Sequence, residues 1–309
     1  MNKAYNNLHL IFQWIISPFK WKLISLLKYL IIFFRKINNS FYKRANFESF
    51  NNSEFLLVNK TIKNPENYIA FSYDKVVSKH LYLNGSFSID VLENVLSILK
   101  KKKSLDVLID VGANIGSTTI PALVRGYFKN AVCIEPDIDN YNILLANIYL
   151  NKLDINKVKT FNFAVGSKDN EKLLFKKSKN NSGDHRIVSK NNLKNINLIK
   201  SYKLDTIIHE SNTKISKNCL IWMDAQGYEP KIIVGSKKIV SLGIPMVIEI
   251  MPNLILKNNL LDLLISGLLN YKYYFDLDNK HNIKHNMNKN IKEKILSIKK
   301  DHVNFLLVN

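Results

Sequence analysis

The sequence predicts an α/β protein built around a doubly wound, mainly parallel sheet. Two observations support this fold class. Short apolar segments alternate with amphipathic segments over residues 107–250, and the stretch LIDVGANIGSTT at 108–119 carries an apolar run straight into a glycine loop. The 309 residues are 46% hydrophobic, which suits one large domain with an appendage, or two small domains, and excludes a disordered chain.

The expected elements follow one another in the order that such a sheet requires. A strand-like segment at 74–83 leads through the turn dipeptide Asn84-Gly85 to a helix at 88–102, for which Ser88 is the expected N-cap. The alternating elements that follow are strands at 107–111, 131–135, 158–163, 219–224 and 245–250, and helices at 116–128, 137–150 and 228–241. Segments 272–278 and 303–309 supply a closing pair of strands at one edge.

The glycine loop has the properties of a ligand-binding turn. Gly112 can adopt backbone angles that a Cβ forbids, and Gly116 permits helix and strand, or backbone and ligand, to approach closely. The first N–H groups of the following helix then point into the crevice above the sheet, where Ser117 and Thr118 add donors. The pattern is GxNxG rather than the dinucleotide fingerprint GxGxxG, so the loop alone is a weak signal.

A second signal lies at the end of the next strand. Glu135 follows Asp110 by twenty-five positions, where doubly wound folds place a carboxylate that binds both hydroxyls of a ribose. Because the carboxyl ends of parallel strands meet at one edge, Glu135 and the glycine loop are expected to lie together. The two signals predict a site for a nucleoside-containing cofactor.

The N-terminal segment 8–36 has a different character. Its apolar run is interrupted by Pro18, Lys20, Lys22 and Lys28, so it does not reach the roughly 18 residues of a bilayer span. On a helix its basic residues share one side and apolar residues fill most of the rest, which is typical of an in-plane membrane helix. A helical hairpin packed on the main domain and a signal peptide are the alternatives, although no small-residue cleavage site is present.

The positive charge is almost entirely lysine. The formal net charge is +20, yet only four residues are arginine: Arg35, Arg44, Arg125 and Arg186. Bidentate recognition of phosphates or bases favours arginine, so we attribute the excess mainly to AT-rich coding and do not expect a nucleic-acid partner.

The two cysteines, Cys133 and Cys219, lie in apolar runs and are expected to be inert core thiols in a reducing compartment. A cytoplasmic location is therefore expected, with segment 8–36 peripheral at the anionic inner face of the membrane as the expected attachment. No cysteine or histidine cluster has zinc spacing, so no metal ion is predicted, while assistance by a divalent ion stays open.

Five segments together resemble a known family. They are DVGANIGSTT (110–119), IEPDIDNYNILLANIYLN (134–151), FNFAVGS (161–167), YKLDTI (202–207) and LIWMDAQGYEPKIIVGS (220–236). In this order they resemble the motifs of FkbM-type S-adenosylmethionine-dependent methyltransferases. The resemblance covers about 67–309 and implies a class I methyltransferase domain: a Rossmann-like, doubly wound, seven-stranded sheet whose last strand is antiparallel. Residues 1–50 are expected to form a helical extension and linker, and residues 1–66 have no counterpart in the family core.

The resemblance also implies a cofactor site for S-adenosylmethionine. The stretch that follows Asn162 and Phe163 would hold the adenine, and Glu135 the ribose. The residues implied around the cofactor are Asp110, Gly112, Asn114, Gly116, Ser117, Glu135 and Ala164. One departure is Trp222, which stands where many relatives have a lysine, so any role of that lysine is absent.

Three residues are candidates for catalysis, because methyl transfer requires an aligned acceptor and removal of its proton. Asp224 ends a strand at the crevice, and its alternative role is to cap the next helix. His185 belongs to the Gly-Asp-His-Arg run of loop 180–187, which suits a flexible lid or is an ordinary polar loop. Glu249 ends the strand 245–250, where an ordinary charge is also common.

The leading hypothesis is O-methylation of a sugar, glycolipid or polysaccharide hydroxyl, which is the acceptor class that the resemblance suggests. An RNA methyltransferase is the second hypothesis, and the missing arginine patch speaks against it. A membrane-bound binding module that has lost catalysis is the third. A nicotinamide-dependent dehydrogenase is disfavoured because Asn114 replaces the second glycine of its fingerprint.

Overall fold

The computed structural model describes residues 26, 29–30, 41–49, 55–101, 103–189, 196–279, 281–288 and 290–309. The chain divides into two compact units, Met1–Phe50 and Asn51–Asn309. In the first unit, residues 41–49 are helical. Most of the predicted helix at 8–36 lies outside the described residues.

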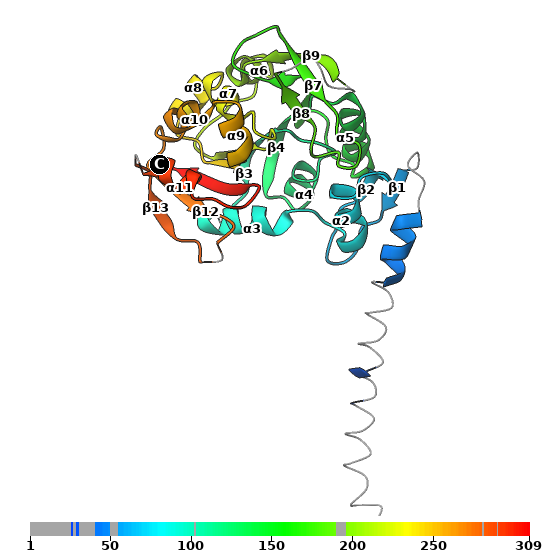
Figure 1. Ribbon diagram of the computed structural model, residues 1–309. Coiled ribbons are helices and arrows are strands. Elements are labelled where there is room, and N and C mark those ends of the chain that lie inside the picture. Colours follow the sequence, from blue (N-terminus) through cyan, green and yellow to red (C-terminus); the bar gives the residue numbers. More distant parts are fainter. Residues whose placement is uncertain are drawn as a thin grey trace, which may run out of the picture. The chain divides into compact units, whose positions relative to one another are not determined.

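The main sheet of the second unit has eight strands in the order β13-β12-β14-β11-β10-β3-β4-β5 (Figure 1). Their bounds are β3 (Leu105–Val111), β4 (Phe128–Ile134), β5 (Val158–Phe161), β10 (Cys219–Met223), β11 (Met246–Ile250), β12 (Tyr273–Asp276), β13 (Lys284–Asn286) and β14 (Val303–Val308). Neighbouring strands from β5 to β11 are parallel, and β14 runs antiparallel between β11 and β12. The predicted doubly wound sheet with an antiparallel last strand is confirmed, and the short β13 adds an eighth strand.

Helices cover both faces of this sheet because its strands alternate between two hydrophobic cores. On β10, for example, Ile221 and Met223 face one core while Leu220 and Trp222 face the other. The first core is completed by α6 (Leu204–Glu210), α7 (Glu229–Val234), α8 (Lys237–Ser241), α9 (Pro252–Lys257), α10 (Leu261–Leu268) and α11 (Ile291–Leu296). The second core is completed by α2 (Val77–Asn84), α3 (Ile89–Ile98), α4 (Thr119–Val124) and α5 (Ile138–Leu150). Figure 1 shows α6, α7, α8 and α10 grouped away from α3 and α4.

A smaller sheet is inserted between β5 and β10, and the sequence patterns did not predict it. Its order is β6-β9-β7-β8, with β6 (Ala164–Val165), β7 (Glu171–Lys176), β8 (Arg186–Val188) and β9 (Ile196–Tyr202). The predicted strand at 158–163 therefore ends earlier, at Phe161, and the chain passes into this second sheet at Ala164.

The predicted strand at 74–83 is wrong, since residues Val77–Asn84 form the helix α2. Asp74 explains the difference: its carboxylate accepts hydrogen bonds from the backbone N–H groups of Val76, Val77 and Ser78 at 2.9–3.2 Å. This satisfies the first turn of a helix, and Val77 and Leu81, four residues apart, then share its buried face. Upstream, β1 (Phe55–Val58) pairs with β2 (Tyr68–Phe71) in an antiparallel ribbon.

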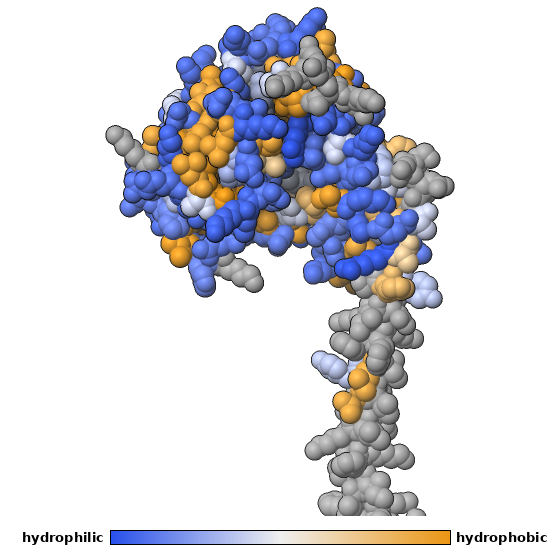
Figure 2. Space-filling model, viewed as in Figure 1, coloured by the Kyte–Doolittle hydropathy of each residue, from blue (hydrophilic) through white to orange (hydrophobic). Residues whose placement is uncertain are grey.

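Three predicted helices differ from the observed ones in their extent. The helix expected at 116–128 is the shorter α4, Thr119–Val124, and Phe128 already belongs to β4. The helix expected at 228–241 is interrupted at Gly235 and Ser236, and becomes α7 and α8. The helix expected at 88–102 spans Ile89–Ile98, and Ser88 precedes it with a left-handed φ of 54° and no side-chain capping bond. The visible surface is mostly hydrophilic with scattered apolar groups (Figure 2), which agrees with a lysine excess spread over the surface.

Candidate active site

A cavity of about 690 Å³ lies at the carboxyl ends of β3, β4, β10 and β11, within the usual size range of ligand pockets. Eight of the ten residues predicted to form the site line it: Gly112, Asn114, Ser117, Glu135, Ala164, His185, Asp224 and Glu249. The predicted cofactor and catalytic residues therefore share one cavity. Asp110 and Gly116 do not line it.

Gly112 allows the glycine loop, which carries predicted cofactor residues, to lie against Asp224, a predicted catalytic residue. Its φ is +86°, and a Cβ at this position would lie 1.9 Å from the carbonyl oxygen of Asp224. The Asp224 N–H donates to the carbonyl of Val111 at 3.0 Å, which keeps the end of β10 against the end of β3. Only glycine allows this approach, and the approach places Asp224 beside the glycine loop.

Asp110 and Gly116 support the loop from below. Asp110 is 1% exposed, and its carboxylate accepts the hydroxyl of Thr119 at 2.5 Å. Burial raises the pKa of Asp110 to about 7. At Gly116, where φ is +88°, a Cβ would lie 2.9 Å from atoms of Ile120 and Leu144. Of the two roles expected for Gly116, the structure thus shows close helix packing.

Glu135 is held in place by the backbone around it. Its two oxygens accept the N–H groups of Asn114 and Asp137, each at 2.8 Å. The side chain is 4% exposed, and burial raises its pKa to about 8 in spite of these bonds. A carboxylate offers about four lone-pair positions, so two are left for hydroxyl groups of a ligand. The N–H of Asn114 donates to Glu135 from a left-handed backbone with a φ of 49°, a conformation that asparagine tolerates.

An aromatic wall follows β5. The ring of Phe163 lines the cavity and packs against Phe161 and Tyr202, with centroids 5.4 and 4.7 Å away. Asn162 donates to the carbonyls of Glu135 and Pro136 at 2.9 and 3.2 Å, which links this wall to the Glu135 strand end. The stretch expected to hold an adenine thus presents an apolar ring to the cavity.

Loop 180–187, expected as a flexible lid or an ordinary polar loop, is hydrogen-bonded to two other parts of the domain. The buried Ser182 donates to the Asp74 carboxylate at 2.6 Å, and its carbonyl accepts the Asn140 side chain at 2.9 Å. His185 accepts the Ser178 N–H through Nδ1 at 3.0 Å, so its proton lies on Nε2 when the ring is neutral. Burial lowers the pKa of His185, which favours that neutral form.

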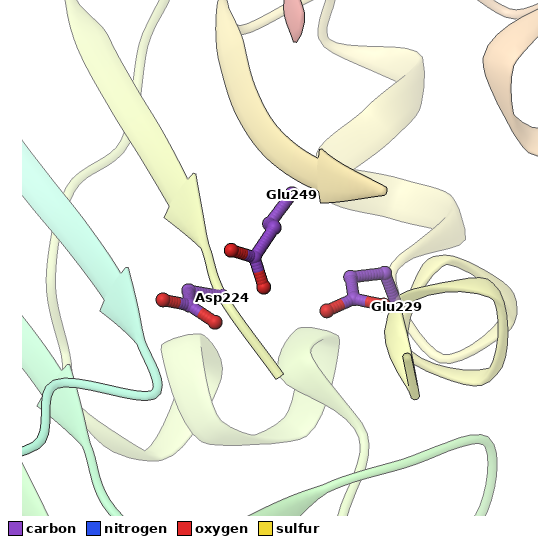
Figure 3. A group of neighbouring side chains, drawn as sticks. All are labelled: Asp224, Glu229 and Glu249. Carbon is purple, nitrogen blue, oxygen red and sulfur yellow. The ribbon is translucent and has the colours of Figure 1, made fainter. Parts of the chain in front are cut away.

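Two predicted catalytic carboxylates meet across one amide. The side-chain amide of Gln226 donates to Asp224 at 2.7 Å and to Glu249 at 2.9 Å. Burial and the nearby Asp224 and Glu229 charges raise the pKa of Glu249 to about 10, and burial also raises the pKa of Asp224. Figure 3 shows both side chains at the ends of neighbouring strands, pointing toward the same space.

Glu229 completes this group and was missed as a site residue. Its Oε1 accepts the N–H groups of Ala225 and Gly227 at 2.8 and 3.2 Å. Glu229 therefore satisfies the turn before α7, which was the alternative capping role expected for Asp224. The side chain is fully buried, which raises its pKa to about 7. The acidic position after the Asp-Ala-Gln-Gly turn was the only available signal in the sequence.

Other lining residues come from elements that the sequence did not connect with the site. Phe87 and Ser88 precede α3, Asn253 lies in the first turn of α9, and His302 precedes β14. His302 reaches the cavity because β14 inserts beside β11, a pairing that no local pattern reveals.

Residues 110–273, just over half of the chain, match the model of the methyltransferase FkbM domain. The chain belongs to the FkbM methyltransferase family. No curated protein matches the chain.

Several solved structures resemble this FkbM-family protein. The methyltransferase FkbM of Methylobacillus flagellatus KT is 19% identical over 52% of this chain and 37% of its own, with a TM-score of 0.35. This chain thus spans little more than a third of that relative. The TYW2 protein of M. jannaschii, solved with AdoMet, is 12% identical over 84% of this chain and 86% of its own (TM-score 0.36). Trm5b of Pyrococcus abyssi is 12% identical over 84% and 56% (TM-score 0.38).

The Gly112 contact predicts a large difference between two glycine substitutions. Gly126 also has a positive φ, +71°, but no atom lies within 4 Å of its Cβ position. Gly126→Ala should therefore cost only the backbone term of about 1 kcal/mol. Gly112→Ala adds a clash with backbone and should cost about 3 kcal/mol or more. Urea denaturation followed by circular dichroism measures both, and equal losses would contradict the constraint.

Proposed function

We propose that this protein transfers the methyl group of S-adenosylmethionine to a hydroxyl group of a sugar or a sugar-containing lipid or polysaccharide. One observation carries the proposal. A single cavity joins a nucleoside-type site, built from Gly112, Glu135 and Phe163, to a cluster of carboxylates at the next strand ends. The membership of the chain in the FkbM methyltransferase family supports the same reaction.

The nucleoside half of the cavity fits the cofactor in three respects. Glu135 retains lone pairs for the two ribose hydroxyls, and Phe163 offers a ring face to the adenine. Ser117 and Thr118 line the wall at the start of α4, where donors suit the carboxylate of the methionine part.

The acceptor half fits a neutral, hydroxyl-bearing group. Methyl transfer from a sulfonium is an in-line displacement, so the protein must align the acceptor oxygen and remove its proton. Asp224 lies beside the glycine loop and is the proposed base or acceptor ligand. His185 and Glu249 line the same cavity and are the proposed partners in acceptor binding. Carboxylates and a neutral imidazole suit sugar hydroxyls better than they suit a phosphate backbone.

Glu135→Ala should weaken S-adenosylmethionine binding by about 2 kcal/mol, the cost of losing charge-assisted hydrogen bonds. Isothermal titration calorimetry with S-adenosylmethionine and with NAD measures the effect, and the wild type should bind only the former. Glu210→Ala, which removes an exposed carboxylate outside the cavity, is the control. Unchanged affinity in a folded Glu135→Ala protein would remove the ribose assignment.

The acceptor class can be tested in cells. We expect one methyl group to disappear from a polysaccharide or glycolipid fraction when the gene is deleted, and to return with the wild-type gene but not with Glu135→Ala. Mass spectrometry of the extracts is the measurement. A methyl group lost from RNA instead would favour the RNA methyltransferase hypothesis and refute the acceptor proposed.

We further propose that segment 8–36 binds an anionic membrane surface and so brings the enzyme to a lipid-linked acceptor. The three described residues of this segment, Leu26, Tyr29 and Leu30, are helical, and 57%, 78% and 42% exposed. Exposed apolar groups on a basic helix are typical of interfacial segments. Within the ranges that the structure describes, no helix has the length and hydropathy of a bilayer span.

Replacing basic residues of this segment by glutamine should release the full-length protein from anionic vesicles, because each lysine near such a surface adds roughly 1 kcal/mol. The replaced residues are Lys22, Lys28, Arg35 and Lys36. A control with the same net charge replaces Lys217, Lys237, Lys257 and Lys272, all exposed in the second unit. Cosedimentation with phosphatidylglycerol vesicles at low and high salt is the measurement. Equal binding by both variants would contradict the proposal.

A further inference from the structure

Three carboxylates converge beside the cavity from three different elements. Asp224 follows β10, Glu229 begins α7 and Glu249 lies near the end of β11. One oxygen of each side chain can be chosen so that all three lie within 4.8 Å of one another. In Figure 3 the three carboxylates point toward a shared space between the two strand ends and the helix.

Glu229 closes this space from the protein side. It is fully buried and does not line the cavity, whereas Asp224 and Glu249 do. Its Oε1 is held by two backbone N–H groups, but its Oε2 is buried without a hydrogen-bond partner among the described residues. A buried carboxylate oxygen of this kind is costly unless something binds it.

Arg186 and His302 line the same cavity and partly offset the rise that burial causes in the pKa of Glu249 and of Asp224, respectively, but neither forms an ion pair with them among the described residues. Within the described part of the chain, no ion pair joins a lysine or arginine to these carboxylates, and Arg186, which lines the cavity, pairs with Asp184. The amide of Gln226 is the side-chain donor to Asp224 and Glu249. A single amide offers two N–H groups to three acidic side chains in a partly buried site, which leaves most of their oxygens without this donor.

We propose that Asp224, Glu229 and Glu249 bind one hard divalent cation of the Mg²⁺, Mn²⁺ or Ca²⁺ class. Carboxylate oxygens are the preferred ligands of these ions, which separates them from zinc and copper. An ion in this space is reached from the cavity past Asp224 and Glu249 and meets one oxygen of the buried Glu229 at the back.

The spacing of the oxygens fits such an ion. A cation bound at 2.3–2.6 Å holds opposite oxygens about 4.6–5.2 Å apart, so a spread within 4.8 Å needs no backbone movement for Ca²⁺ and only small side-chain rotations for Mg²⁺. Gln226 can assist, because reversing its amide would present a carbonyl oxygen where it now presents an N–H group.

The cation gives the acceptor half of the cavity a specific task, and this step rests on the proposed function. A hydroxyl oxygen of the acceptor that binds the ion loses its proton more easily, and it is oriented at the same time. The expected acceptors are then those sugars that can bind the ion through a free hydroxyl group.

The test measures metal binding by the full-length protein without cofactor or acceptor, so that its outcome does not depend on the proposed function. The protein is first treated with a chelator and dialysed. MnCl₂ is then titrated, and free Mn²⁺ is followed by electron paramagnetic resonance, with CaCl₂ and MgCl₂ as competitors. We expect one Mn²⁺ per chain, displaced by the other two ions.

Isosteric variants identify the site. Glu249→Gln and Glu229→Gln should each weaken Mn²⁺ binding at least about tenfold, since even outer-shell changes at metal sites cost that much. Glu229→Gln keeps an oxygen for the N–H groups of Ala225 and Gly227. Should it nevertheless unfold, Glu249→Gln and Asp224→Asn decide, because these two side chains accept from the amide of Gln226 and hold no backbone turn as Glu229 does. Glu210→Gln is the surface control and should bind Mn²⁺ like the wild type.

No stoichiometric Mn²⁺ binding below millimolar concentration, or equal binding by the wild type and the folded site variants, would overturn the proposal. Binding with the expected variant pattern in a protein that methylates no glycan would support the cation site and refute the proposed acceptor. Methylation that proceeds unchanged in excess chelator would support the proposed function and overturn the role of the cation.

Discussion

The contact between the Cα of Gly112 and the carbonyl of Asp224 is the constraint on which both halves of the cavity depend. It brings the end of β10 against the glycine loop, closer than any residue with a Cβ would permit. Because β10 is the centre of the sheet and carries β11 beside it, the position of Asp224 also sets that of Glu249. A small change at this glycine would therefore move the acceptor-side carboxylates relative to the cofactor loop.

Residues outside the matched domain hold the other side of the same loop. The side-chain amide of Asn147 in α5 accepts the N–H of Ile69 and donates to the carbonyl groups of Ile69 and Ile115. Asp74 in turn holds Ser182 in the wall of the cavity. Ile69 and Asp74 precede residue 110, where the match to the family domain begins. The cavity of this domain is therefore supported by residues that lie outside the matched range.

The sequence predicted those features that depend on local pattern, and it failed where distant segments decide. The strands β3, β4, β5, β10 and β11 were readable because continuous apolar runs alternate with amphipathic helices. The segment at 74–83 was misread because the carboxylate of Asp74, rather than hydrophobicity, selects a helix there. His302 and Glu229 could not be placed, because their positions follow from the insertion of β14 and from a turn closed by backbone N–H groups. Eight of the ten predicted site residues line one cavity, most of them because the carboxyl ends of parallel strands share one edge, whereas Asp110 lies beneath the loop because its carboxylate binds Thr119.

The cofactor and acceptor halves both bury carboxyl groups, but they differ in how closely these groups lie together, and this difference indicates their roles. Glu135 accepts two backbone N–H groups, and burial still raises its pKa. Asp224, Glu229 and Glu249 converge on one space, share one side-chain amide and one turn, and leave one buried Glu229 oxygen without a hydrogen-bond partner among the described residues. Folding alone would favour apolar residues at these strand ends, since a buried charge without compensation costs stability. Proteins keep such local violations mainly at functional sites, so the unsatisfied carboxylates point to the acceptor side as the place where a ligand supplies what the fold does not.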